Sequence, residues 1–205
     1  MDLVSELARR RVLAIVRADS AELALTCVRA VTAAGITAVE ISLTTRGALD
    51  AIARARAELD ESVLIGAGTV MTAHQANDVA QAGAGFVVTP ADTAGGRHAA
   101  EIGLPLLCGA LTPTEMVTAM THGAQAVKLF PASLHGPAYV KELKAPFPAL
   151  PLVAVGGVDA ALAPEYLRAG AIAVGVGSPL IGDAGQGGDP SGVTDRALAL
   201  LSALG

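Results

Sequence analysis

Aromatic side chains and cysteines are scarce in this chain of 205 residues. Aromatic residues make up 2% of it, tryptophan is absent, and the two cysteines are Cys27 and Cys108. A core with so few rings must be built from alanine, valine, leucine and isoleucine. Without a Cys-x-x-Cys pair or a secretory signal, we predict no disulfide framework and expect both thiols to be buried.

Positive charge and long apolar runs are also lacking. The formal net charge is −5, whereas a nucleic-acid-binding protein needs a basic face. The one basic cluster, Arg9 to Arg11, is expected at the solvated end of a short first helix. No stretch reaches the roughly 18 apolar residues of a membrane span, and the charged N-terminal segment does not look like a secretory signal. We therefore expect a cytoplasmic protein without nucleic-acid or membrane partners.

Apolar runs of strand length are abundant instead. The chain is 52% hydrophobic, and its length fits one domain, residues 1–205, near the lower size limit of a (β/α)8 barrel. Eight β-rich runs recur at similar spacing: Val12–Arg17, Ala38–Leu43, Leu64–Val70, Gly85–Pro90, Pro105–Leu111, Ala126–Pro131, Leu152–Gly157 and Ala171–Ser178.

Amphipathic helical patterns separate these runs. Several of them end in a glycine just before the next run, as helix-to-strand connections do, and Thr72, Thr112 and Asp159 are plausible N-caps. The connection Ala91–Ile102 is the weakest helix because two adjacent glycines interrupt it. The other predicted helices are Ala21–Ala34, Gly47–Leu59, Thr72–Ala82, Thr112–His122, Pro137–Ala145, Asp159–Ala169 and Val193–Leu204.

Strands that alternate with helices indicate a parallel sheet. Strands that are apolar along their whole length indicate burial on both faces. Eight such units in one domain favour closure into a (β/α)8 TIM barrel, and the alternative is a doubly wound open sheet. The segment 181–191, rich in glycine and aspartate, is predicted to be a mobile loop.

Lys128 is an unusual residue because it stands inside an apolar strand. Alternation puts Ala126, Lys128 and Phe130 on one face of that strand. In such a barrel the carboxyl ends of the strands carry the active site, and an amine among apolar neighbours can attack a ketone to form an imine. A lysine that reaches the barrel mouth and pairs with a carboxylate is the alternative, and the strand pattern alone does not decide between them.

Glu40 is the matching acidic residue. It lies three residues before the end of the second strand, as Lys128 lies three residues before the end of the sixth, so the two are expected at similar depth. A carboxylate in an apolar strand is costly to bury without a partner. The pair is interpreted as a general acid–base beside an imine-forming amine, with a structural ion pair as the alternative.

Anion-binding signals stand at the ends of other strands. Arg17 suits bidentate recognition of a carboxylate or phosphate, and the Thr69 hydroxyl can donate to a bound anion. Glycines expose backbone N–H groups where many barrels hold a phosphate, after the seventh and eighth strands; the residues there are Gly156, Gly157, Gly177 and Ser178.

Metal ligation is not predicted. The four histidines, His74, His98, His122 and His135, fall in helical or loop segments and do not pair at a metal-ligand spacing. Neither a nucleophile elbow nor a phosphate-binding Walker loop is present. We therefore expect no metal and no cofactor.

Ordered segments over nearly the whole chain resemble the KDPG (2-keto-3-deoxy-6-phosphogluconate) and 4-hydroxy-2-oxoglutarate aldolase family. The residues that carry the resemblance are Val39–Thr45, Ile65–Val70, Phe86–Pro90, Val127–Ala132, Gly136–Pro148, Val155–Val158 and Gly175–Ser178. The resemblance implies a class I, metal-independent aldolase that works through an imine and assembles as a homotrimer.

Individual roles follow from the same resemblance. Lys128 matches the Schiff-base lysine of the family, and Glu40 matches its general acid–base. The remaining matches are substrate contacts: Thr69, Pro90 and Phe130 around the pyruvoyl group, and Gly156, Gly157, Gly177 and Ser178 around the phosphate.

Two positions depart from the family pattern. Some members have an arginine for the substrate carboxylate where this chain has Thr44, while Arg46 follows two residues later and Arg17 matches another active-site arginine. Many members have a threonine where this chain has Val155, and the valine form also occurs in 2-keto-3-deoxy-6-phosphogalactonate aldolases. Thr44 stays a candidate substrate-binding residue, and the C4 stereochemistry of the substrate stays open.

The predicted reaction is cleavage of 2-keto-3-deoxy-6-phosphogluconate to pyruvate and D-glyceraldehyde 3-phosphate. The alternatives that use the same lysine are cleavage of 4-hydroxy-2-oxoglutarate and cleavage of 2-keto-3-deoxy-6-phosphogalactonate. A phosphosugar isomerase or synthase on the same barrel generally needs carboxylates and a metal, which the histidine placement disfavours. A phosphosugar-binding barrel without turnover would not need both Lys128 and Glu40.

Overall fold

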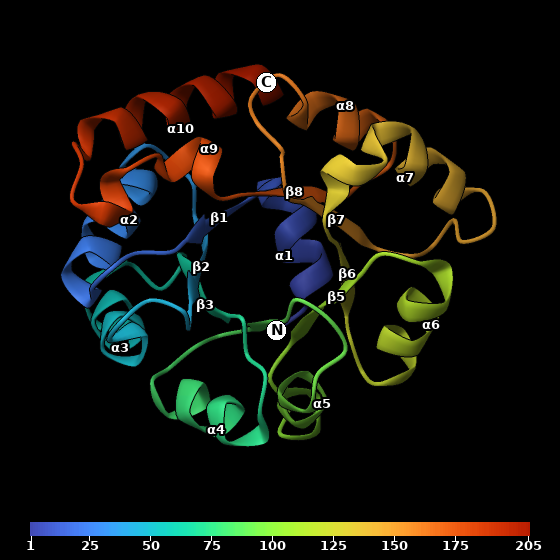
Figure 1. Ribbon diagram of the computed structural model, residues 1–205, viewed down its shortest axis with the longest axis horizontal. Helices are drawn as coiled ribbons and strands as arrows, with labels where there is room; N and C mark the ends of the chain where they lie inside the picture. The colour runs from blue at the N-terminus through green and yellow to red at the C-terminus, as the bar shows by residue number, and fades with distance from the viewer.

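Eight parallel strands close into one barrel in the order of the sequence. The computed structural model describes all 205 residues, and in Figure 1 the helices surround the ring of strands. The predicted (β/α)8 barrel is therefore confirmed. The strands are β1 (Val12–Val16), β2 (Ala38–Ser42), β3 (Leu64–Gly68), β4 (Val87–Val88), β5 (Leu106–Ala110), β6 (Ala126–Leu129), β7 (Leu152–Val155) and β8 (Ala173–Val176).

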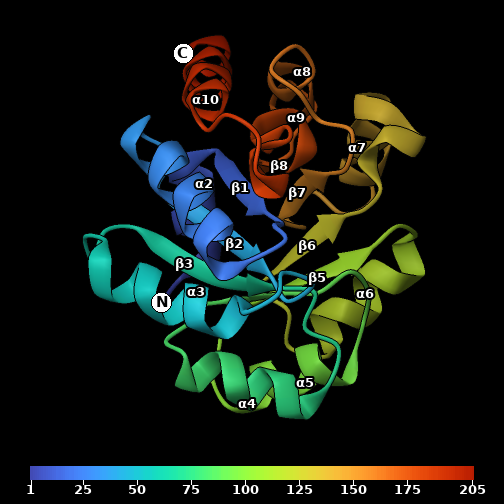
Figure 2. The same cartoon turned by 60° about the vertical axis from the view of Figure 1, so that its left-hand side comes forward.

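Helices connect consecutive strands along the outside of the barrel, as the turned view in Figure 2 also shows. No helix has the length and apolar content that crossing a membrane requires. The helices are α1 (Leu3–Arg10), α2 (Ala21–Ala33), α3 (Ala48–Glu58), α4 (Ala73–Gln81), α5 (Ala94–Glu101), α6 (Pro113–Thr121), α7 (Gly136–Lys144), α8 (Ala163–Arg168), α9 (Ser178–Ile181) and α10 (Ser191–Leu204), with 3-10 turns at Ala132–Leu134 and Ala184–Gln186.

Two of the three predicted N-caps are confirmed. Thr72 and Thr112 each accept a hydrogen bond from the backbone N–H three residues on, and their own N–H groups donate to the side chains of Gln75 and Glu115. The third, Asp159, is wrong, because α8 begins only at Ala163. The Asp159 carboxylate accepts instead from the N–H groups of Ala161 and Leu162 in the preceding turn, and Pro164 lies in the first turn of the helix, where its missing N–H is tolerated.

The weakest predicted helix is confirmed, and one predicted strand is shorter than expected. The glycine-interrupted connection Ala91–Ile102 does form a helix, α5, because the glycines allow a close approach: a Cβ at Gly95 would lie 2.8 Å from the Thr72 nitrogen on α4's N-cap. Strand β4 is short, yet the ladder continues beyond it through Gly85 N–H to Ile65 O and Thr89 N–H to Leu107 O. Both features involve contacts between neighbouring units.

The core has two layers. Residues such as Val39 and Ile41 pack between the strands and the helices, while Phe86 and Leu107 fill the interior of the barrel. Successive residues of a strand belong alternately to the outer and the inner layer, as the pleat requires. Consequently the predicted face of Ala126, Lys128 and Phe130 points into the barrel.

Helix α1 closes the amino-terminal end of the barrel and lies behind the ring in Figure 1. Leu3 and Leu7 are fully buried against the interior residues, and Leu3 N–H donates to the Gln125 side chain at 3.0 Å. The expectation of a solvated arginine cluster is wrong for Arg10. Its side chain is 5% exposed, and its guanidinium donates to the carbonyl oxygens of Thr37 and Ser62, because α1 lies flat across the strand ends.

Candidate active site

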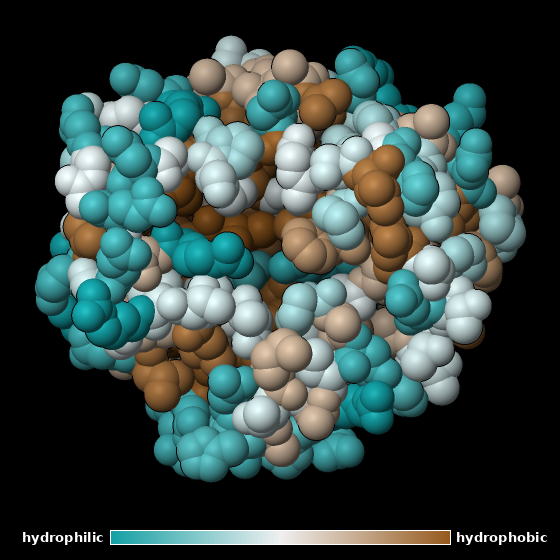
Figure 3. Space-filling view, in the orientation of Figure 1, coloured by the Kyte–Doolittle hydropathy of each residue, from teal (hydrophilic) through white to brown (hydrophobic).

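A cavity of about 670 Å³ opens at the carboxyl ends of the strands. Figure 3 looks onto this face, where a hollow at the centre shows apolar residues inside and hydrophilic residues around its edge. Ten of the eleven residues predicted for the site line this cavity: Arg17, Glu40, Thr69, Pro90, Lys128, Phe130, Gly156, Gly157, Gly177 and Ser178.

Lys128 reaches the cavity from the inner face of β6. Its side chain is buried, and Nζ lies 5.2 Å from the centroid of the Phe130 ring, within cation–π range. No carboxylate oxygen lies within 4.0 Å of Nζ, so the structural ion pair is not present. The amine therefore faces the cavity without a fixed anionic partner.

Glu40 is the buried acid of the cavity. It is 1% exposed, and its Oε2 has no hydrogen-bond partner. Burial raises the pKa of this carboxyl, while the positive charges of Lys128 and Arg17 oppose the shift. A carboxyl with a raised pKa and a free oxygen is suited to taking up and returning a proton.

The inner face of β3 makes room for these groups. A Cβ at Gly68 would overlap Oε1 of Glu40, and a Cβ at Gly66 would overlap the ring of Phe86. The glycine pair of this strand thus has a steric role in addition to the close ligand approach that its sequence suggests. The carboxylate of Glu40 can occupy its position only while residue 68 lacks a side chain.

Thr69, directly after β3, has a left-handed backbone with φ of 62°. This conformation is unfavourable for a β-branched residue, at about 1–3 kcal/mol, and it occurs mainly where surrounding contacts impose it. Here it places Thr69 at the cavity wall, on the same rim as Pro90 and Phe130. The peptide bond between Phe130 and Pro131 is cis.

Arg17 and Arg46 differ in position. Arg17 follows β1 and is the only arginine that lines the cavity. Arg46 is exposed, and its Nε donates to the carbonyl oxygen of Asp19 at 3.0 Å. Thr44 is exposed and does not line the cavity. The geometry therefore gives the Thr44 side chain no direct contact with a substrate in the cavity.

Glycines form the wall after β7 and β8. Gly156 and Gly157 have φ of 98° and 71°, and a Cβ at Gly157 would lie 2.6 Å from the Ser133 Cβ. Gly177 and Ser178 follow the neighbouring strand β8, at the start of α9. Small residues on both sides leave this end of the cavity open to a bulky polar group.

The segment 181–191 contributes to the site, although it was predicted only as a mobile loop. It ends α9 and forms a 3-10 turn, and Ala184 is buried. Gly185 and Gln186 line the cavity, and a Cβ at Gly185 would overlap the carbonyl oxygen of Arg17. The glycine–aspartate composition carries no signal for this, because the contact joins the two ends of the chain.

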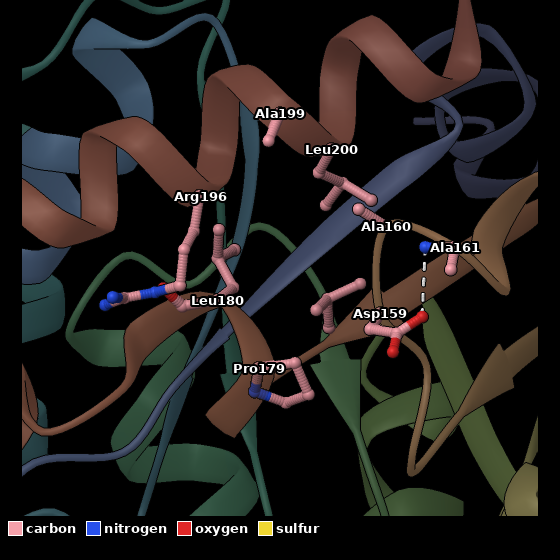
Figure 4. A pocket seen from close by; sticks show the side chains of 9 residues that line it. Asp159, Ala160, Ala161, Pro179, Leu180, Arg196, Ala199 and Leu200 are labelled. Carbon is pink, nitrogen blue, oxygen red and sulfur yellow. Dashed lines mark hydrogen bonds between the residues drawn. The ribbon is translucent and has the colours of Figure 1, made fainter.

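A second, smaller cavity of about 220 Å³ lies behind α9. Figure 4 shows it between α9, α10 and the turn at Asp159, with mostly apolar residues around it. The guanidinium of Arg196 points away from this cavity and donates to the carbonyl oxygens of Leu180 at 2.7 Å and Ile181 at 2.8 Å. Arg196 thus ties α9 to α10, and this cavity holds no group with evident chemistry.

Proteins of one family match this chain. The family model for KDPG and KHG aldolase matches residues 3–193. The 2-dehydro-3-deoxy-6-phosphogalactonate aldolase of Escherichia coli K12 is 38% identical over 170 residues, which cover 82% of this chain and 83% of the relative. The 2-dehydro-3-deoxy-phosphogluconate aldolase of Pseudomonas aeruginosa is 38% identical over 159 residues, 77% and 72% of the two chains.

A solved structure agrees over the same length. It is KDPG aldolase from Legionella pneumophila, with pyruvate captured as a covalent carbinolamine intermediate. The TM-score is 0.87 at 29% identity, with coverage of 96% of this chain and 97% of the other.

Proposed function

We propose a specific reaction for this chain, which belongs to the KDPG and KHG aldolase family and is therefore a carbon–carbon lyase. The reaction is cleavage of 2-keto-3-deoxy-6-phosphogluconate to pyruvate and D-glyceraldehyde 3-phosphate. The observation that carries the proposal is the placement of Lys128 and Glu40, two buried groups that face one cavity without pairing to each other.

Lys128 is the nucleophile of the proposed mechanism. Its amine attacks the C2 ketone, and loss of water gives a protonated imine. Glu40 removes the proton of the C4 hydroxyl, the C3–C4 bond breaks, and its electrons move into the imine to give an enamine. The aldehyde leaves, the enamine is protonated at C3, and hydrolysis releases pyruvate and the free lysine. The carbinolamine with pyruvate in the Legionella relative supports this chemistry.

The two ends of the substrate carry negative charge. We assign the carboxylate to Arg17 and the Thr69 hydroxyl, because a guanidinium binds carboxylates bidentately and Arg17 is the only arginine at the cavity. We assign the phosphate to the glycine wall and Ser178, which leave room for it. Pro90 and Phe130 line the apolar part around the pyruvoyl group. No metal or cofactor enters this mechanism.

The galactonate epimer is a second candidate substrate. The E. coli relative acts, by its name, on 2-dehydro-3-deoxy-6-phosphogalactonate and is as similar to this chain as the phosphogluconate aldolase of P. aeruginosa. An assay of pyruvate release from the two C4-epimeric substrates separates them. We expect the phosphogluconate epimer to have the higher kcat/KM; the reverse order would reassign the substrate. 4-Hydroxy-2-oxoglutarate, which has no phosphate, serves as the third substrate, and Ser178→Ala is expected to lower kcat/KM only for the two phosphorylated ones.

The imine itself is tested by chemical trapping. Pyruvate with borohydride is expected to modify Lys128 and to leave Lys141 and Lys144, on the outer helix α7, unmodified. Mass spectrometry of the peptides measures the modification. Lys128→Arg retains the charge but cannot form the imine, so it is expected to lose both the adduct and essentially all turnover. An unmodified Lys128 in the wild-type chain would contradict the mechanism.

We also propose a homotrimer. The support is the resemblance of the chain to its family. Sedimentation equilibrium measures the mass in solution, and a mass of one or two chains would contradict it.

A further inference from the structure

Three hydroxyl side chains stand in a row behind the cavity wall. The Ser42 Oγ, at the end of β2, lies 3.1 Å from Oγ1 of Thr69 and 2.8 Å from Oγ1 of Thr44. Ser42 is fully buried, and of the three only Thr69 lines the cavity. The row therefore connects an exposed hydroxyl at the rim to a hydroxyl that meets the substrate.

A backbone hydrogen bond limits the bonds in this row to two directions. The Thr44 N–H donates to Ser42 Oγ at 3.4 Å, and a serine oxygen has two acceptor positions and one proton. In one of the two, the Thr44 hydroxyl donates to the second acceptor position and the proton of Ser42 points to Oγ1 of Thr69. The proton of Thr69 is then left for the cavity.

The left-handed backbone of Thr69 makes this arrangement rigid. The peptide groups on either side of it are held by bonds from Leu43 N–H to Gly68 O at 2.8 Å and from Val70 N–H to Val88 O at 3.4 Å. With the backbone held, only χ1 and the hydroxyl torsion of the residue can still rotate. Ser42 is the one side chain that forms a hydrogen bond with it.

We propose that Ser42, supported by Thr44, is a positioning residue that aims the Thr69 hydroxyl proton at the carboxylate of the bound keto acid. The inference rests on the proposed function and assigns a role to two residues outside the cavity. A donor that is oriented before binding does not need to be reoriented by the ligand, so the keto acid binds more tightly. Thr44 then affects substrate binding without contacting the substrate.

The test compares two ketones in the trapping reaction at Lys128. Pyruvate carries the carboxylate, and hydroxyacetone lacks it. Ser42→Ala removes the donor, and we expect the pyruvate concentration for half-maximal trapping to rise roughly 2- to 12-fold, the range of a lost hydrogen bond between neutral groups. The value for hydroxyacetone is expected to stay unchanged. Thr44→Val is expected to shift pyruvate in the same direction by a smaller factor.

Conservative and remote variants complete the design. Ser42→Thr keeps a hydroxyl and is expected to restore much of the pyruvate affinity. Thr121→Val, on the exposed face of α6, removes a threonine hydroxyl of the same kind and is the matched control. If Ser42→Ala fails to fold, Thr44→Val carries the test, because Thr44 is exposed.

The outcomes separate this inference from the proposed function. Equal shifts for both ketones, or no shift for pyruvate in Ser42→Ala and Thr44→Val, would overturn the role of Ser42 while leaving the imine intact. Absence of any pyruvate adduct on Lys128 in the wild-type chain would overturn the proposed function and the inference together.

Discussion

Glu40 is a carboxyl group that folding removes from water. The pleat of β2 turns it into the barrel, and no protein donor reaches its Oε2. Burial raises its pKa in spite of Lys128 and Arg17. Burial of the charged form costs free energy of folding. A carboxyl with a raised pKa in a cavity is typical of a functional site, where it exchanges protons.

The pH dependence of stability tests this raised pKa. As pH rises past the ordinary glutamate range, the unfolded chain loses the Glu40 proton before the folded chain does, which lowers the free energy of unfolding. Glu40→Gln lacks this effect. We therefore expect the variant to gain stability relative to the wild type as pH increases through the raised pKa, by urea unfolding at a series of pH values. Glu61→Gln, in an exposed loop, is the control; parallel curves for Glu40→Gln and wild type would contradict the prediction.

Strands and their pleat determine which side chains meet inside the barrel. Along β3 two of the inward positions are glycines, Gly66 and Gly68, and the space beside them is filled by Glu40 from β2 and by Phe86, just before β4. A barrel of this size has no interior volume to spare, so a large inward residue on one strand requires a small one beside it. The glycines of β3 are thus part of the positioning of the acid.

Gly68→Ala tests this steric relation. The added methyl group overlaps the Glu40 carboxylate, so we expect a loss of turnover of at least tenfold and a destabilisation of about 1–3 kcal/mol, the usual effect of overpacking. The double variant with Glu40→Ala removes the overlap and is expected to be more stable than Gly68→Ala alone. A double-mutant cycle in chemical unfolding measures this coupling. Full activity of Gly68→Ala would show that the carboxylate is not confined.

At the scale of the whole molecule, the two ends of the barrel have different tasks. The carboxyl ends hold the cavity, and α1 seals the amino ends through Leu3 and Leu7. Without α1, the lower interior residues such as Leu13 would face water. Helix α1 therefore contributes to the stability of the fold and not to the chemistry in the cavity.

Leu7→Ala separates these two tasks. Truncation of a fully buried leucine is expected to lower the free energy of unfolding by about 2–5 kcal/mol, measured by chemical unfolding. Trapping of pyruvate on Lys128 is expected to persist under native conditions, because the cavity lies at the opposite end. Leu198→Ala, at an exposed position of α10, is expected to change stability by less than about 0.5 kcal/mol. Loss of trapping in folded Leu7→Ala would contradict the separation.

Local periodicity was sufficient to predict most of this architecture. Alternation of apolar runs with helical patterns depends on residues a few positions apart, and it predicts eight units, a parallel barrel and the strand ends where chemistry gathers. The same two-residue period places Glu40 and Lys128 on inward faces. The lining of the cavity by eight of the ten predicted residues follows from these two facts, whereas the places of Pro90 and Phe130 were implied by the resemblance to the family.

Closure of the barrel decided the remaining features. It brings the segment after β8 against Arg17, directs Arg46 to a backbone carbonyl, and leaves Glu40 without an ion pair. It also hides Ser42 behind Thr69 while Thr44 stays outside the cavity. Burial and hydrogen-bond partners are properties of residues far apart in the chain, so they exist only once the first and last strands have met.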